Sequence, residues 1–113
     1  MTDGQQMVIP THGEMSVSSI VPAILTKQAN SLVPEDILEA DCIVLLVLDG
    51  LGWNQIKEHR GDLPFLHAGS ATAITTVAPS TTAAALTSIA TGVPPGEHGV
   101  IGYKIPTPQG LLN

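Results

Sequence analysis

The sequence predicts an α/β fold, because stretches typical of buried strands alternate with stretches typical of helices. Residues 42–48 are apolar without alternation, as expected of a strand buried on both faces of a parallel sheet. A helix is predicted over 53–60, a second strand over 72–78 and a further helix over 81–91. Parallel strands joined through a helix form a right-handed crossover, so the expected sheet is mainly parallel.

Proline and glycine mark the ends of these elements. Pro79 stops the second strand, and Gly92 is placed to terminate the helix over 81–91. A Pro-Pro-Gly turn follows at 94–96, and a third strand is predicted over 100–105.

Nearer the N-terminus the pattern indicates two short helical segments. Apolar residues recur at helical spacing over 17–25, and Pro22 requires a helix here to start near it or to bend there. Ser31 resembles an N-cap before a helical turn at 33–36, which carries acidic residues early. Both segments are interpreted as scaffold.

The chain of 113 residues is long enough for one compact domain and too short for two. Residues 1–15 are polar and contain glycine, so they are predicted to form a flexible N-terminal lead-in, and residues 16–113 the domain. Hydrophobic residues make up 43% of the chain, which allows a core. That core must be aliphatic, because Trp53, Phe65 and Tyr103 are the only aromatic residues.

Charge and cysteine content exclude several classes of protein. Four basic residues face ten acidic ones, so the net charge of −6 predicts no nucleic-acid surface, which requires clustered Lys and Arg. The single cysteine excludes an intrachain disulfide. The apolar run over 42–48 is too short to span a bilayer, and the N-terminus has no basic leader. We therefore expect a cytoplasmic protein with no membrane segment.

Asp49 is the first candidate site residue, because it directly follows the predicted first strand. Ligands of open α/β sheets bind beyond the carboxyl ends of the strands. A carboxylate there must be hydrated, hydrogen-bonded or metal-bound, and Gly50 and Gly52 leave room for a ligand. The alternative is that Asp49 merely caps the following helix.

Thr82 is the second candidate, because it lies just beyond the second strand. With Ser80 as the N-cap, Thr82 falls in the first helical turn, beside free backbone N–H groups and the positive end of the helix dipole. A phosphoryl group on its oxygen would be stabilised there. Taken alone, the pattern favours the alternative that Ser and Thr only cap the helix.

Other patterns indicate no further cofactor site. The dinucleotide-binding fingerprint is incomplete, because Gly50 and Gly52 match its first two glycines but Gln55 stands at the position of the third. The histidines show no pair at i, i+4 spacing on one helix. His98 follows the Pro-Pro-Gly turn and is interpreted as orienting its loop.

Three strings in order carry a family resemblance: Val-Leu-Leu-Val-Leu-Asp-Gly-Leu-Gly-Trp, Ala-Pro-Ser-Thr-Thr-Ala-Ala-Ala-Leu-Thr-Ser-Ile-Ala-Thr-Gly and Pro-Pro-Gly-Glu-His-Gly-Val-Ile-Gly-Tyr. Over about 40–113 the chain resembles the N-terminal part of the alkaline phosphatase superfamily, in its type I phosphodiesterase and nucleotide pyrophosphatase branch. The resemblance implies the first part of a three-layer α/β/α sandwich with a mainly parallel sheet. Residues 16–113 would then be an incomplete catalytic domain.

The same resemblance implies a metal-dependent hydrolase of phosphoric esters. Asp49 falls on a metal ligand of the family, and Thr82 on the nucleophile, which is also a ligand; Thr81 is the less favoured neighbour. The family site holds two zinc ions and passes through a phosphothreonine intermediate. The physics agrees, because a threonine hydroxyl is a poor nucleophile unless a metal lowers its pKa. The implied substrate is a small phosphate ester or a nucleotide.

Two departures from the family pattern shape the remaining expectations. Ala85 stands where many nucleotide pyrophosphatases carry an Asn that binds a phosphoryl oxygen, and the family's other zinc ligands lie further C-terminal. Zinc requires about four ligands, so we expect a truncated chain that is inactive alone and holds no metal. The alternative is a non-catalytic α/β remnant or binding module without a metal site. We also expect self-association through exposed sheet edges, since the apolar strand would lack cover.

Overall fold

The regular secondary structure of the described residues consists of helices and one short antiparallel hairpin. The computed structural model describes residues 8–67, 69 and 71–112. The elements, in chain order, are η1 (Val17–Ser19), α1 (Ile20–Thr26), α2 (Glu35–Leu38), α3 (Trp53–Glu58), η2 (Arg60–Asp62), α4 (Pro64–His67), α5 (Thr82–Thr91), α6 (Pro95–His98), β1 (Ile105–Thr107) and β2 (Gly110–Leu112).

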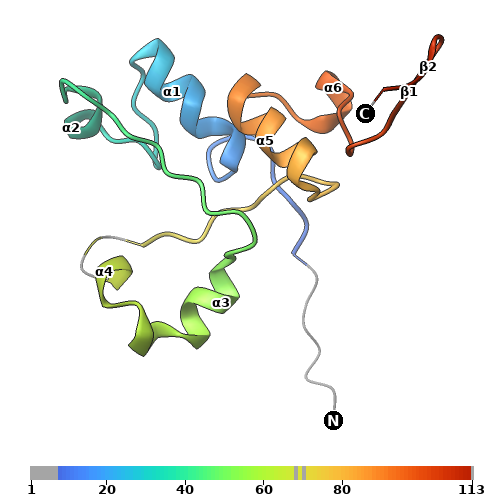
Figure 1. Ribbon diagram of the computed structural model, residues 1–113. Helices are drawn as coiled ribbons and strands as arrows, with labels where there is room; N and C mark the ends of the chain where they lie inside the picture. The colour runs from blue at the N-terminus through green and yellow to red at the C-terminus, as the bar shows by residue number, and fades with distance from the viewer. Residues whose placement is uncertain (1–7, 68, 70, 113) are drawn as a thin grey trace.

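Helix α5 is the centre of the packed part of the molecule. It contacts η1, α1 and α6, and these elements lie together in Figure 1. Its small side chains permit this close packing, and Ala84 and Ser88 are fully buried. The helix ends where the glycine pattern predicted, because Gly92 has φ 78° and donates its N–H to the Ser88 carbonyl.

A close approach between α1 and α5 also requires a glycine at position 92. A Cβ atom added there would collide with the Pro22 ring. Pro22 lies in the first turn of α1, where its missing N–H costs no hydrogen bond. The prediction of a helix that starts near Pro22 is therefore confirmed.

A small second cluster forms around α2. Ala23, Val33 and Leu38 are buried together. Asn30 closes the loop between α1 and α2, because its Oδ1 accepts the N–H groups of Leu32 and Val33 at 2.9 and 2.8 Å. The N-cap predicted at Ser31 is therefore wrong: the capping side chain is one residue earlier, and Pro34 precedes α2 without a side-chain cap.

Neither of the two long strand predictions corresponds to a strand in the described residues, and Figure 1 shows both segments as extended connections. Residues 42–48 lie outside any strand, with Val44 85% and Leu46 75% exposed. In 72–78 only Thr75 pairs, in a parallel bridge with Ser16. An apolar pattern predicts that a segment is buried. A strand also needs a hydrogen-bonded neighbouring strand, and the pattern does not identify that neighbour.

The hairpin at the C-terminal end was not predicted as such. Strands β1 and β2 pair antiparallel, with Thr107 opposite Gly110. The Thr107 hydroxyl donates to the Gly110 carbonyl at 2.8 Å and tightens the turn. The strand predicted over 100–105 overlaps β1 only at Ile105, and the turn predicted at 94–96 is the start of helix α6.

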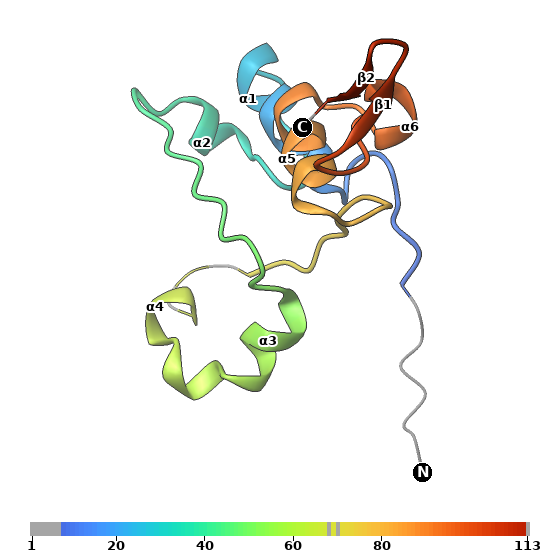
Figure 2. The ribbon, with the colours of Figure 1, turned by 45° about the vertical axis from the view of Figure 1, so that its right-hand side comes forward.

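Helices α3 and α4 form a separate limb. In Figures 1 and 2 this limb lies apart from α1, α5 and α6, at the end of two extended connections. The radius of gyration is 16.3 Å, against about 13 Å for a compact domain of this length. Much apolar surface is consequently uncovered. The helix predicted over 53–60 is confirmed in α3 and continues as the 3-10 turn η2.

The predicted lead-in is described only in part, because residues 1–7 lie outside the described residues. Further along, the Thr11 N–H donates to the Thr75 hydroxyl at 3.2 Å, and the Thr75 N–H donates to the Met15 carbonyl at 2.9 Å. None of the helices described is long and apolar enough to cross a membrane. The cytoplasmic location stays a prediction.

Candidate functional site

The structure brings Asp49 and Thr82 into direct contact. The Thr82 Oγ1 hydroxyl donates a hydrogen bond to Asp49 Oδ2 at 3.0 Å, although the two residues are 33 positions apart. Both side chains line one cavity. Two residues chosen from separate parts of the sequence therefore meet at one place.

Asp49 reaches this place through a tight turn. It follows the extended segment 42–48, and Gly50 has φ 75°, a left-handed conformation that favours glycine. A Cβ atom on Gly50 would meet nothing within 4 Å, so the space beside the turn is open. Asp49 itself is exposed.

Thr82 is placed by the start of α5, of which it is the first residue. The N-cap is Thr81, whereas the sequence pattern predicted Ser80. Thr81 has the extended backbone of a cap, and its Oγ1 accepts the Ala84 N–H at 3.4 Å. Thr82 remains in the first helical turn, which is the feature that the prediction depended on.

The hydroxyl groups of the two adjacent threonines have different partners. Thr81 Oγ1 donates to the Ile101 carbonyl at 2.8 Å, in the chain that leads to the hairpin. Thr82 Oγ1 donates to Asp49. One hydroxyl therefore ties the helix to its surroundings, while the other faces the carboxylate in the cavity.

The cavity around these groups has a volume of about 450 Å³ and is lined by apolar and polar residues. Leu48, Leu51 and Leu86 are among the apolar ones, and Ala85 lines the cavity with a methyl group. The polar side chains that line it are Asp49, Gln55, Thr76, Ser80 and Thr82. Sequence reasoning missed Gln55 and Thr76, because neither belongs to a motif and only the fold brings them here.

The predicted metal can be tested against these donors. A carboxylate and a hydroxyl are oxygen donors of the kind that bind cations, and here the 3.0 Å between the two oxygens is that of a hydrogen bond. In the part of the chain that the structure describes, no group of three or more His, Cys, Asp or Glu residues could hold a metal ion. Asp49 and Thr82 supply at most two of the about four ligands that zinc requires.

His98 holds the loop after α6 against α5. The Val100 N–H donates to His98 Nδ1 at 3.0 Å, so Nδ1 is an acceptor and the ring hydrogen is on Nε2. Nε2 lies 2.9 Å from the Oγ of Ser88, which is fully buried, and donates to it. This geometry agrees with the interpretation that His98 orients its loop, and it links that loop to the helix that carries Thr82.

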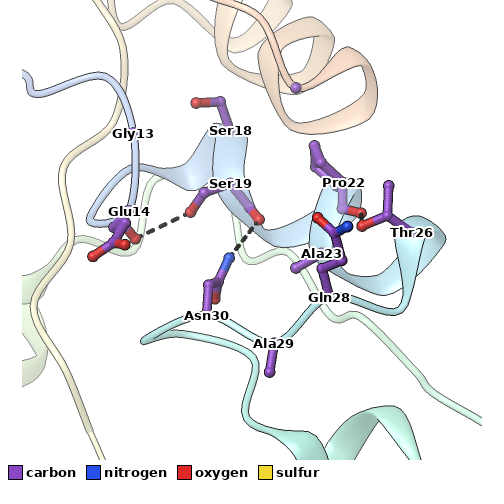
Figure 3. Close-up of a pocket in the computed structure, with 11 residues that line it drawn as sticks. Gly13, Glu14, Ser18, Ser19, Pro22, Ala23, Thr26, Gln28, Ala29 and Asn30 are labelled. Atoms are coloured by element: carbon purple, nitrogen blue, oxygen red, sulfur yellow. Dashed lines mark hydrogen bonds between the residues drawn. The ribbon is translucent and has the colours of Figure 1, made fainter.

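A second cavity, of about 390 Å³, lies beside α1 and is drawn in Figure 3. Three of its polar side chains donate to backbone carbonyls. Ser19 Oγ donates to the Glu14 carbonyl, and Asn30 Nδ2 donates to the Ser19 carbonyl. Thr26 donates to the Pro22 carbonyl. These contacts stabilise α1 and its connection to the neighbouring loops, and they indicate a structural role.

Comparison with known proteins gives one match. The family model described as Type I phosphodiesterase / nucleotide pyrophosphatase matches residues 43–111, a span that includes both Asp49 and Thr82. No curated protein matches the chain, and no solved structure does.

Proposed function

Because the chain belongs to the type I phosphodiesterase / nucleotide pyrophosphatase family, we propose that it contributes to metal-dependent hydrolysis of phosphoric esters, with Thr82 as the nucleophile. The observation that carries this proposal is the 3.0 Å hydrogen bond between Thr82 Oγ1 and Asp49 Oδ2, in a cavity lined by both residues. The substrate is a small phosphate ester or a nucleotide.

The proposed reaction has two balanced steps. In the first, Thr82 Oγ1 forms a bond to phosphorus, the bond from phosphorus to the leaving oxygen breaks, and the hydroxyl proton passes by way of water to the leaving alcohol. In the second, water attacks the phosphothreonine, which returns the proton to Thr82 Oγ1 and releases the phosphate product. Asp49 orients the Thr82 hydroxyl before attack, as its hydrogen bond indicates.

Asp49 and Thr82 would hold a zinc ion through their oxygens, and the family resemblance implies two zinc ions in the complete site. A bound zinc ion would lower the pKa of the Thr82 hydroxyl and neutralise phosphate charge. This contribution is needed here, because the cavity is lined by no Lys, Arg or His among the described residues.

The hydroxyl geometry supports Thr82 over Thr81 as the nucleophile. Thr81 is occupied as a cap, since its oxygen accepts the Ala84 N–H and its hydrogen goes to Ile101. An attack by Thr81 would break its bond to the Ile101 carbonyl and would compete with its role as the N-cap. An attack by Thr82 would break only the hydrogen bond from its Oγ1 to Asp49.

We propose that the extended segments 42–48 and 72–78 become strands of a mainly parallel sheet in the α/β/α sandwich of this family when neighbouring strands pair with them. Asp49 and Thr82 follow these two segments, as expected for a site beyond the carboxyl ends of strands. The Ser16–Thr75 bridge is parallel. Exposed apolar residues along 44–48 also support the proposal that copies of the chain associate through this segment.

We further propose that the chain has negligible hydrolase activity by itself. The described residues bring one carboxylate to the cavity, whereas zinc requires about four ligands. The same observation favours a second candidate function, a non-catalytic α/β remnant or binding module that holds no metal. Zinc binding separates the two.

The decisive experiment grafts residues 43–111 into a complete, active member of the same family, in place of the matching segment. Hydrolysis of a nitrophenyl phosphodiester and zinc titration by calorimetry are then measured. We expect about two zinc ions and an active chimaera, whose kcat falls about a thousandfold or more in Thr82→Ala. A remnant would leave a chimaera that binds no zinc.

Two variants make the assignment specific. Thr82→Ser retains a hydroxyl and should retain activity. Thr81→Asn removes the neighbouring hydroxyl but keeps a good N-cap, so it should remain active. If Thr81→Asn abolishes hydrolysis while Thr82→Ala does not, the nucleophile is Thr81.

A further inference from the structure

We infer that His98 is a positioning residue for Thr82, because it fixes the segment 98–101, which in turn holds the start of α5. The inference deepens the proposed function, on which it rests for the chemical role of Thr82. It concerns hydrogen bonds among the described residues and does not depend on a bound metal. His98 is not among the residues that line the cavity, so it acts through other groups.

The Thr82 hydroxyl is not fixed by its own helix. Two other threonines of α5, Thr87 and Thr91, donate at 2.7 Å to carbonyl groups one turn earlier in the same helix. Thr82 is the first residue of α5, so no helical turn precedes it, and its hydroxyl donates to Asp49 instead. The direction of this hydroxyl therefore depends on how the start of the helix is held.

The start of α5 is held by the residue before Thr82. Thr81 Oγ1 accepts the Ala84 N–H as the N-cap and also donates to the Ile101 carbonyl at 2.8 Å. The second bond joins the cap to a segment 20 positions further along the chain. A fixed Ile101 carbonyl therefore fixes the Thr81 side chain, and with it the helical turn that carries Thr82.

His98 holds the segment 98–101 through both ring nitrogens. Nδ1 accepts the Val100 N–H at 3.0 Å, and Nε2 donates to Ser88 Oγ at 2.9 Å. Gly99, with φ 74°, makes the turn that returns Val100 to the ring. Ser88 is fully buried in α5, so the ring is tied to a packed part of the helix. The segment is thereby joined to α5 at two places, the turn of Ser88 and the N-cap.

The experiment measures the χ1 rotamer of Thr82 in the purified 113-residue chain by nuclear magnetic resonance, from the three-bond couplings of its methyl carbon to the backbone. In the wild type we expect one staggered rotamer, with Oγ1 toward Asp49. Ser88→Ala removes the acceptor of the His98 ring and should average these couplings over two or more rotamers. Thr87 is fixed by its own helix, so its couplings should not change, which shows that α5 is still folded.

Two substitutions of His98 separate its two bonds. His98→Asn keeps an acceptor for the Val100 N–H but is too short to reach Ser88. His98→Gln can reach Ser88 with its NH₂ group but has no acceptor in the place of Nδ1, so it tests the inference even if Ser88→Ala unfolds the chain. Both should average the Thr82 couplings, because the hold on Ile101 requires both bonds. The matched control is His59→Asn, at an exposed histidine of the α3–α4 limb, which should leave those couplings unchanged.

Three results would contradict the inference. The first is a wild type whose Thr82 couplings are already averaged. The second is a set of wild-type couplings for Thr82 in both His98 variants. The third is an equal change at Thr87, or in His59→Asn, which would show a general loosening of the chain.

Failure of the proposed function is decided by a different measurement. If Thr82→Ala remains active in the chimaera, Thr82 is not the nucleophile and the proposed function fails. The Thr82 couplings in the purified chain still decide whether His98 holds the start of α5. If the couplings do not respond to the His98 variants while Thr82→Ala abolishes activity, the proposed function stands and the inference is wrong.

Discussion

The two oxygens of the site come from regions that are packed very differently. Thr82 is on α5, where Ala84 and Ser88 are fully buried and α1 and α6 pack alongside. Asp49 follows the segment 42–48, where Val44 is 85% exposed. One half of the site is positioned by a packed core, and the other by a turn and a single hydrogen bond.

The contrast shows that an apolar segment is buried only where other parts of the chain pack against it. Helix α5 buries small side chains because α1 and α6 pack against it. The apolar segment 42–48 needs a neighbouring element on each face to be buried. Full burial of one Val or Leu side chain stabilises a folded protein by about 1.5–3 kcal/mol, and this segment does not gain that stabilisation here. Asp49 is therefore the less constrained partner.

The largest expected effect compares one substitution in both regions. Gly92→Ala should lower the free energy of unfolding by about 2–4 kcal/mol, because it strains a left-handed residue and collides with Pro22. Gly50→Ala strains a left-handed residue in open space and should cost only about 1–2 kcal/mol. Urea denaturation measures both, and equal losses would contradict the packing difference.

A smaller effect is expected for the contact that joins α5 to α6. Ser88→Ala leaves the Nε2 hydrogen of His98 without its acceptor and should cost about 1–3 kcal/mol. Thr91→Ala removes an exposed hydroxyl near the end of the same helix and serves as the control. Thermal unfolding should show a lower Tm for Ser88→Ala than for Thr91→Ala; the reverse order would show that His98 does not hold the helix.

The link between the two regions can be measured directly. A double-mutant cycle of Asp49→Asn and Thr82→Val should give a coupling energy of about 0.5–1 kcal/mol, small because Asp49 is exposed. Urea denaturation of the four proteins measures it. A coupling energy of zero would mean that the two side chains meet only briefly in solution.

The smallest expected effect on stability accompanies a change in association. Leu46→Lys places a charge on the exposed apolar segment and should change the free energy of unfolding by less than about 0.5 kcal/mol. It should also lower the average mass measured by sedimentation, because like charges on paired strands repel. The control is Leu25→Lys, at an equally exposed leucine on α1, which should leave the average mass unchanged. If Leu25→Lys lowers the mass as much as Leu46→Lys does, association depends on exposed apolar residues in general and not on the segment 42–48.

The helices could be predicted from the sequence because their signals are local. A glycine at position 92, a proline at 22 and small residues between 82 and 91 act within one or two turns. The cap at Thr81 was misplaced by one residue, because Ser80, Thr81 and Thr82 are all good caps by composition. Only the backbone geometry and the contact with Ile101 distinguish them.

The approach of Asp49 to Thr82 was predicted, whereas the rest of the cavity was not. Those two residues follow the two most strand-like segments, so a general rule for α/β sheets brings them together. Gln55 and Thr76 have no pattern that predicts their position on the cavity wall. The β1–β2 hairpin was missed for a related reason, since its pairing depends on a turn at 107–110 and not on hydrophobic periodicity.

The bridge between Ser16 and Thr75 has a consequence for the order of folding. It joins positions that are far apart along the chain, and Asp49 lies within the loop that it closes. Closing a long loop costs entropy that increases with the logarithm of its length, whereas the contact between α5 and α6 closes a short one. We therefore expect α5 to be in place early and the carboxylate to arrive late, so that the reactive pair is among the last contacts the chain makes.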